Sequence, residues 1–134
     1  MAGFSNSLSQ AVINHFFRNV SQTPPAAIYL GIAVADPTDV TATALTNEIS
    51  AGWYARQLIQ FEAPSSAVDV DTGNTNTVTF AAVTGGAVTA THWMLFDAIT
   101  NGNLLASGAF TTAKVFSVDD VPKLVPNDLM LTLV

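Results

Sequence analysis

The sequence contains no cysteine and few charged residues, and both shortages limit what the protein can do. Without cysteine it forms no disulfide, no thiolate zinc site and no cysteine nucleophile. Charged residues make up 10% of the 134 positions, well below the roughly 25% of an average soluble protein. The 4 basic residues are outnumbered by 10 acidic ones, and the formal net charge is −6. This balance argues against nucleic acid or an anionic membrane as the main partner, because both require a basic surface.

Long hydrophobic runs are also missing. The longest apolar stretch, residues 26–35, is about half as long as the roughly twenty residues of a transmembrane helix. The N-terminus lacks the basic segment and apolar run of a signal peptide. We therefore expect a soluble protein that is made in the cytoplasm, with a single domain spanning residues 1–134.

The chain is nevertheless apolar. Hydrophobic residues account for 49% of it, and its mean hydropathy is +0.39. Few charged side chains remain to cover the surface of a monomer, so we expect the protein to bury more of that surface by assembling into an oligomer or a large particle.

One helix is predicted near the N-terminus, over about residues 6–19. Apolar side chains recur there at helical spacing: Leu8, Val12 and Phe16, with Ile13 and Phe17 beside them. Ser7 and Gln10 fit a capping box, and Ser5 or Asn6 are the alternative caps. The helix should end near Asn19, because the prolines that follow cannot continue it. We expect this helix to pack on the core; the alternative is an arm that packs on a neighbouring subunit.

The remaining pattern is that of strands. Apolar alternation or β-forming composition predicts strands over seven segments: residues 28–34, 55–61, 77–82, 88–97, 104–110, 114–118 and 129–133. Asn101-Gly102 between two apolar runs indicates a tight hairpin. The fold class predicted is mainly β, an antiparallel β-sandwich of about seven strands, immunoglobulin-like or jelly-roll-like, with one N-terminal α-helix. The long loops at 36–53 and 62–76, which include small-residue and polar stretches at 40–45 and 64–76, are candidate contact surfaces.

Catalytic groups are sparse. His15 lies in the helical segment with no acid nearby, and His92 lies in a predicted strand. Alternation places His92 on one face with four apolar residues: Val88, Ala90, Met94 and Phe96. That face should be the core, so we expect a structural histidine. The sequence has no nucleophile elbow, P-loop, dinucleotide fingerprint or zinc-protease motif. An enzyme such as a wall hydrolase would need an acid pair or metal ligands in one cleft.

Carboxylates occur as turn-like pairs, Asp36 with Asp39, Asp69 with Asp71 and Asp119 with Asp120. Residues 69–74 resemble part of a calcium loop, but the glycine comes one place early and Phe80 stands where the closing glutamate should be. We expect no cofactor and no metal, and leave open only a weak calcium site near Asp69 and Asp71.

The segment 47–57 is the most informative, because it combines a tryptophan, a tyrosine, an arginine and a glutamate. Glu48 is the acid nearest to Arg56 in sequence, and we predict a structural salt bridge that anchors the loop to the following strand. The alternative makes Trp53, Tyr54 and Arg56 contact residues, because these three types dominate interface hot spots.

Several motifs together carry a family resemblance over residues 8–110: Phe16-Phe17-Arg18, Thr23-Pro24-Pro25, Ile28-Tyr29-Leu30-Gly31-Ile32, Asn47-Glu48-Ile49, Gly52-Trp53-Tyr54-Ala55-Arg56-Gln57, Trp93, Asp97-Ala98, Gly102 and Leu104-Leu105. The run from Gly52 to Gln57 is the most specific of them. On these residues the chain resembles a family of small structural proteins of tailed bacteriophages, often labelled tail or tail-fibre proteins.

The resemblance implies a virion component without enzymatic activity or catalytic residues. Our first expectation is a capsid decoration (cement) protein on the outer surface of the shell, which binds the major capsid protein and itself. A homotrimer is favoured, because decoration proteins often occupy threefold lattice points. The chain also lacks the long repetitive shaft of a fibre. The alternative is a tail or tail-tip protein that binds tail proteins or a host surface.

Both placements use the same candidate contact residues. These are Phe16, Phe17 and Arg18 at the end of the helix, and Trp53, Tyr54 and Arg56 in the later segment. No nucleic acid and no membrane is expected among the partners, and the protein would be made in the host cytoplasm.

Overall fold

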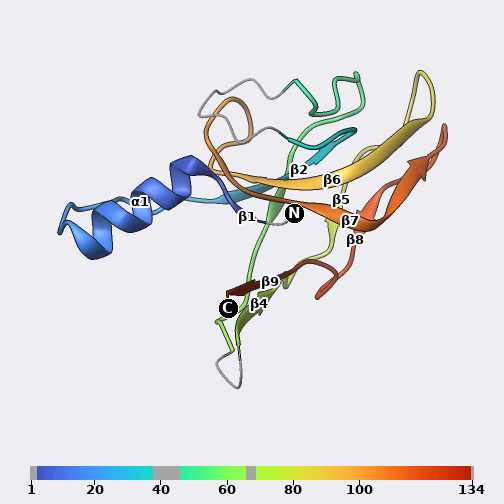
Figure 1. Ribbon diagram of the computed structural model, residues 1–134. Helices are drawn as coiled ribbons and strands as arrows, with labels where there is room; N and C mark the ends of the chain where they lie inside the picture. The colour runs from blue at the N-terminus through green and yellow to red at the C-terminus, as the bar shows by residue number, and fades with distance from the viewer. Residues whose placement is uncertain (1–2, 38–45, 66–68, 134) are drawn as a thin grey trace.

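Strands dominate the computed structural model, which describes residues 3–37, 46–65 and 69–133 (Figure 1). Asp39 and the small-residue loop predicted at 40–45 lie outside the described residues. The elements in chain order are β1 (Gly3–Phe4), α1 (Asn6–Phe17), β2 (Ile28–Ala33), β3 (Gln57–Ile59), β4 (Val70–Gly73), β5 (Val78–Thr79), β6 (Val88–Phe96), β7 (Leu104–Phe116), β8 (Lys123–Leu124) and β9 (Met130–Leu133).

The main sheet has five antiparallel strands in the order β1-β7-β6-β2-β3. Its centre is the hairpin of β6 and β7. The turn between these strands places Asn101 and Gly102 at φ 54° and 71°, a left-handed conformation that Asn-Gly adopts with little strain. The hairpin predicted from the Asn-Gly pair is confirmed, but its connection spans residues 97–103 and is longer than the tight turn that was predicted.

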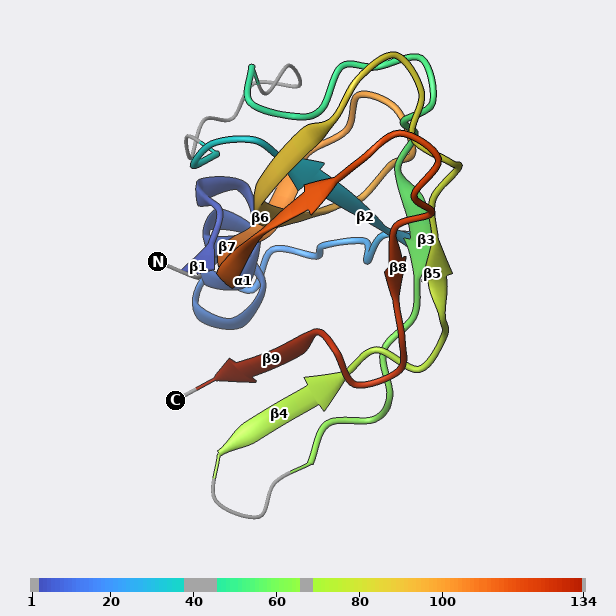
Figure 2. The same ribbon diagram turned by 90° about the vertical axis from the view of Figure 1, so that its right-hand side faces the viewer.

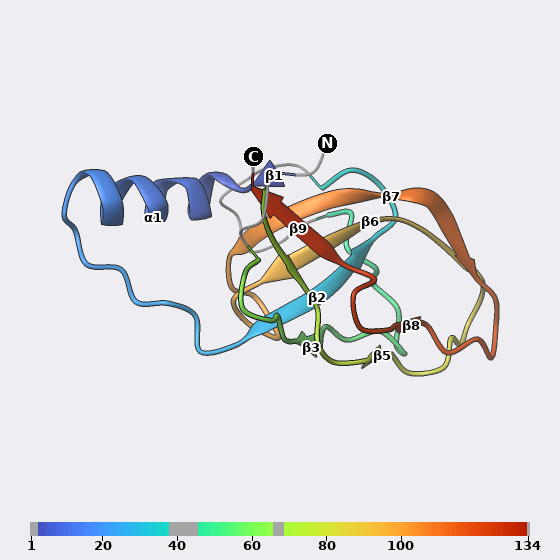
Figure 3. The same cartoon turned by 90° about the horizontal axis from the view of Figure 1, so that it is seen from below.

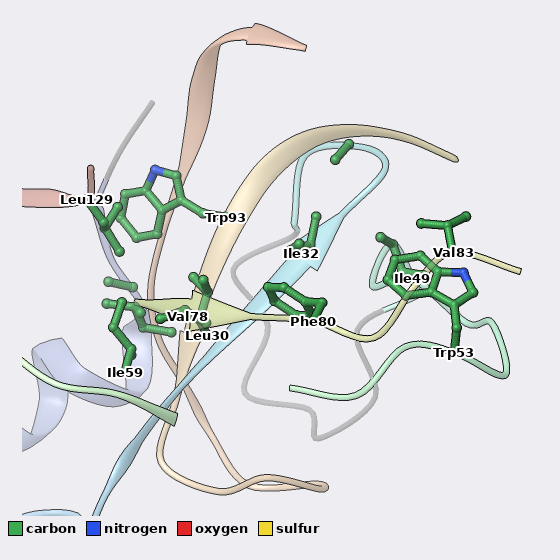
Figure 4. Packing of buried hydrophobic residues seen from close by; sticks show 13 residues of the cluster. Leu30, Ile32, Ile49, Trp53, Ile59, Val78, Phe80, Val83, Trp93 and Leu129 are labelled. Carbon is green, nitrogen blue, oxygen red and sulfur yellow. The ribbon is translucent and has the colours of Figure 1, made fainter. Parts of the chain in front are cut away.

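Two short strand pairs, β4-β9 and β5-β8, lie against one face of this sheet (Figures 2 and 3). The core fills the space between the two layers, and Figure 4 shows Val78 and Phe80 facing Leu30 and Ile32. The predicted class, a mainly-β antiparallel sandwich with one N-terminal helix, is confirmed.

Strand boundaries differ from the prediction at several places. The strand predicted over 77–82 is only β5, and β1 and β8 were not predicted. The strand predicted over 55–61 is shorter and covers only β3. The polar segment 64–76, predicted as a loop, contains β4, which pairs with the C-terminal β9. Residues 114–118 are not a separate strand, because β7 runs on for 13 residues to Phe116. The described residues therefore hold nine strands, because pairing with distant segments extends or ends a strand independently of its local pattern.

An irregularity in the pairing of β6 with β7 changes which side chains share a face. The register with β7 shifts between Ala90 and His92. Ala90 consequently belongs to the main core, whereas Met94 and Phe96 pack in a second cluster with Ala33 and Leu104. The single predicted face through residues 88–96 is therefore wrong. One residue of β6 stands against four of β7 between the pairs Ala90–Lys114 and His92–Ala109, and regular alternation does not continue across such an irregularity.

Helix α1 is capped by Ser5. Its hydroxyl accepts a hydrogen bond from the Leu8 amide at 3.1 Å and donates one to the Leu104 carbonyl of β7. Ser5 is thus the cap, and the capping box predicted at Ser7 and Gln10 is not formed. The helix ends at Phe17, two residues before Asn19, which adopts φ 56°.

The expectation that α1 packs on the core is wrong. No residue of α1 is buried, and the helix projects from the sandwich while the chain returns beside it to β2 (Figures 1 and 3). Only its first turns contact β1 and β7. Within the described part of the chain, no helix has both the length and the apolarity to cross a membrane.

Candidate functional site: the Arg56 cluster and the helix arm

Arg56 lies in the interior and is fully engaged. Its guanidinium binds Glu48 through two nitrogens, with Nε donating to Oε1 at 2.8 Å and Nη2 donating to Oε2 at 2.7 Å. Its Nη1 donates to the carbonyls of Ala98 and Asn101 in the β6-β7 turn. The guanidinium also lies 3.3 Å from the centre of the Phe96 ring, a cation–π geometry. Arg56 therefore joins the loop that carries Glu48 to the central hairpin.

Tyr54 completes this cluster from the other side of Glu48. Its hydroxyl donates to Glu48 Oε1 at 2.7 Å and accepts from the Ile32 amide of β2 at 2.9 Å. Its ring stacks on Phe80, with 5.9 Å between ring centres. Burial, followed by the Glu48 carboxylate, raises the pKa of Tyr54 well above its ordinary value. The phenol thus stays protonated and acts as a fixed donor, not as an acid or base.

The raised pKa of Tyr54 predicts a loss of stability at high pH. The unfolded chain releases this proton above about pH 10 while the folded chain keeps it. The contribution of Tyr54 is therefore fully present below about pH 10 and declines as the pH rises further. In thermal melts between about pH 8 and pH 11, the melting temperature of the wild type should fall as the pH rises. In the Tyr54→Phe variant this decrease should be smaller. Tyr29→Phe, at the only other tyrosine, should keep the full decline, and identical slopes in both variants would contradict this prediction.

Gly31 allows the cluster to close. A Cβ at this position would lie 2.9 Å from the Phe96 ring, 3.1 Å from the Tyr54 hydroxyl and 3.2 Å from Glu48 Oε1. Sequence reasoning missed Gly31, Phe96 and the two turn carbonyls as parts of the site. A glycine within an apolar strand is a signal of close approach by a neighbour, so Gly31 could have been found.

The structure separates the two groups of predicted contact residues. Trp53 and Arg56 are 7% and 6% exposed, and Tyr54 packs between them and the sheet. Their side chains point inward, so we assign them to the stability of the fold and do not propose them as contact residues. Burial removes them from the surface of this chain.

The other group lies at the free end of α1. Phe16 and Phe17 are 73% and 80% exposed, and Arg18 is exposed beside them, where it bonds the Asn14 side chain. Ile13 and Val20 are also exposed. We call these four apolar side chains, Ile13, Phe16, Phe17 and Val20, the arm tip.

Among the residues that the structure describes, the remaining titratable groups form no catalytic constellation. His15 makes an edge contact with Phe16. His92 bonds the Thr91 hydroxyl at 2.8 Å and lies 3.7 Å from the exposed Asp36. Across residues 3–37, 46–65 and 69–133, no three His, Asp or Glu side chains gather as a metal site would require. Asp71 is part of β4, where its backbone pairs with β9 and with Ser65.

Comparison with known proteins identifies the family. The family described as "Podophage GP4 fiber I protein gp80" matches residues 3–132. The chain belongs to this family. The gp80 family consists of tail-fibre structural proteins of tailed phages, so the predicted resemblance is confirmed and the chain is a structural protein of the phage virion. No curated protein matches it.

Family membership also bears on the two predicted locations in the virion, the capsid shell and the tail. A gp80-family protein agrees with the tail alternative better than with capsid decoration. A structural family is in keeping with the expectation of no enzymatic activity. The match includes both the Arg56 cluster and α1, so each is part of the gp80 domain.

Proposed function

We propose that this gp80-family protein is a non-enzymatic assembly module of the phage tail fibre, and that α1 anchors it to a neighbouring tail-fibre subunit. The observation that carries the proposal is the uncovered arm tip. Two phenylalanines more than 70% exposed at the end of a projecting helix are unusual for a surface that only meets water. Burying each would contribute roughly 1.5–3 kcal/mol, enough for an anchor.

The rest of the fold suits such a module. The Arg56 cluster ties the loop at 46–56, β2 and the β6-β7 turn into one unit. The arm therefore extends from a braced sandwich, and its attachment would transmit load to the sheet instead of to a loose loop. Capsid decoration, which was our first expectation, has the weaker support, because the family to which the chain belongs is described as a fibre protein.

The experiment is to locate and count the protein in purified virions. We expect a small number of copies relative to the major capsid protein, with antibody label confined to the tail. Copies in simple proportion to the capsid protein, with label on the shell, would support decoration and overturn the proposal.

The same phage can test the anchor. Virions carrying Phe16→Ser with Phe17→Ser should lose most of the protein, because removing two hot-spot aromatics costs about 4 kcal/mol or more, or roughly a thousandfold in affinity. The matched control is Val118→Ser with Val121→Ser, two other exposed apolar residues, which should leave incorporation unchanged. Normal incorporation of the phenylalanine variant would refute α1 as the anchor.

A further inference from the structure

We propose that the subunit contacted by the arm tip is a second copy of this chain, and that the tip lies in an apolar groove beside β9 of that copy. This inference rests on the proposed function in treating α1 as an anchor, and it adds the identity of the partner and the surface that receives the arm.

The apolar stripe of α1 continues beyond the part that its own fold covers. Leu8 and Val12 are half-buried near the root of the helix, and Phe16 follows on the same face one turn later with 73% exposure. Phe17 and Ile13 form a second exposed row beside it. A stripe of this kind is the feature with which an amphipathic helix binds an apolar groove.

The same chain carries a groove of matching character. It has a volume of about 660 Å³ and lies between β1 and the β4-β9 pair, which stand apart in Figure 2. We call it the β9 groove, and its apolar lining includes Phe4, Val70, Trp93, Met130, Leu131 and Leu133. Four of these are 42–53% exposed: Phe4, Val70, Met130 and Leu133.

The groove cannot be filled by the arm tip of its own chain in this fold. Phe4 and Ser9, at the root of α1, form one wall of the β9 groove, and the helix leads away from that wall (Figures 1 and 3). The β9 groove lies at the root of α1 and the arm tip lies at its far end. The arm tip of one copy can therefore bind in the β9 groove of another. Two copies related by a two-fold axis would each donate one arm and accept one, and a ring of three would close by passing each arm to the next.

Charge also favours a second copy as the occupant. Residues 1–35 contain one basic residue, Arg18, and no Asp or Glu, whereas residues 36–134 contain 3 basic and 10 acidic residues, a net −7. Asp71 lines the β9 groove, and Asp69 precedes it. An arm that carries Arg18 and no acid is therefore attracted to the acidic body of another copy, and the attraction falls with salt.

The buried area reaches what a stable pair needs. Two phenylalanines of about 150 Å² each bury roughly 300 Å² per arm. Two exchanged arms and the two groove surfaces that they cover then bury roughly 1,000 Å², the minimum expected of a specific interface. Ile13 and Val20 add to this area.

The first test is the mass of the purified full chain by light scattering at micromolar concentration. We expect a dimer or a trimer, and Phe16→Ser with Phe17→Ser should convert it to a folded monomer with an unchanged circular dichroism spectrum. The control Val118→Ser with Val121→Ser should keep the oligomer. A wild-type monomer, or an oligomer that survives the phenylalanine substitutions, would overturn the inference.

The second test uses the absence of cysteine. One preparation carries Val20→Cys beside the phenylalanines, the other carries Leu133→Cys in the β9 groove, and the two are mixed and oxidised by copper-phenanthroline. A disulfide forms between chains only where the two sulfurs meet, so the mixed pair should give a covalent heterodimer. Val20→Cys mixed with Val118→Cys should give little, and equal yields from both mixtures would contradict the β9 groove as the acceptor.

The outcomes also separate this inference from the proposed function. A monomer in solution whose phenylalanine variant is lost from virions would leave α1 as an anchor to a different tail protein and overturn only the second copy. An arm-dependent oligomer found on the capsid shell would overturn the tail assignment and leave the arm exchange intact.

Discussion

Replacing Arg56 with alanine is expected to lower the melting temperature by roughly 10–15 °C. The substitution removes the main counter-ion of Glu48, whose side chain is only 15% exposed, and leaves the carbonyls of Ala98 and Asn101 without a donor. Breaking a buried ion pair in this way costs about 3–5 kcal/mol, and each kcal/mol shifts the midpoint of a domain of this size by about 3–4 °C. Differential scanning calorimetry measures the effect directly.

Three further variants show whether the geometry or the charge of Arg56 is responsible. Arg56→Lys keeps the positive charge but lacks the planar fork that binds Glu48 through two nitrogens, so it should recover only part of the loss. Adding Glu48→Gln to Arg56→Ala should restore some stability, because no uncompensated charge then remains. Arg18→Ala removes an exposed arginine and should move the midpoint by less than about 2 °C. An unchanged midpoint for Arg56→Ala would disprove the bracing role of the cluster.

Replacing Asn74 with leucine is expected to cost about 3 kcal/mol or more of unfolding free energy. Asn74 is 0% exposed. Its Nδ2 donates to the carbonyls of Asn76 and Val125 at 2.9 and 3.0 Å, and its Oδ1 accepts from the Leu129 amide at 3.0 Å. The substitution leaves the buried Leu129 amide without its acceptor and two partly buried carbonyls without their donor. A buried polar group that loses its partner costs about 1–3 kcal/mol, and a partly buried one costs less.

Asn76 provides the matched control for Asn74. It also makes two side-chain hydrogen bonds to backbone, accepting from Gln60 and donating to Leu58, but these bonds lie where water can replace them. Asn76→Leu should therefore destabilise the protein clearly less than Asn74→Leu in urea unfolding. Equal midpoints for the two variants would show that the burial of Asn74 adds nothing.

The position of Asn74 explains why its loss should matter beyond local bonding. Its backbone exchanges hydrogen bonds with Leu129 and Asn127, immediately before β9. The side chain adds Val125 to the same junction. Asn74 therefore holds the segment that leads into β9 against the end of β4, and β9, which lines the β9 groove, begins directly after that segment.

Local sequence pattern predicted the parts of the fold that depend on neighbouring residues. Alternating apolar residues predicted β2 and β6, and Asn101-Gly102 predicted the central hairpin, since period and turn conformation are local properties. The pairing of Glu48 with Arg56 was predictable, because the chain has few charged residues and Glu48 is the acid nearest to Arg56 in sequence. The register shift between β6 and β7 next to Ala90 and the formation of β4 by residues 70–73 were not predictable, because each depends on pairing with another strand.

By itself, the sequence determined the mainly-β class, the single helix and its apolar stripe, and the acidic, cysteine-free composition. Only the tertiary structure decided which aromatic residues face outward. Trp53 and Tyr54 have the side chains of interface anchors but lie inside, whereas Phe16 and Phe17 have a core pattern but lie outside. The physical reason is that a side chain is buried only where another segment covers it. The chain returning from α1 to β2 leaves the arm tip uncovered. The sequence pattern of an apolar stripe is the same whether its own fold or another subunit covers it.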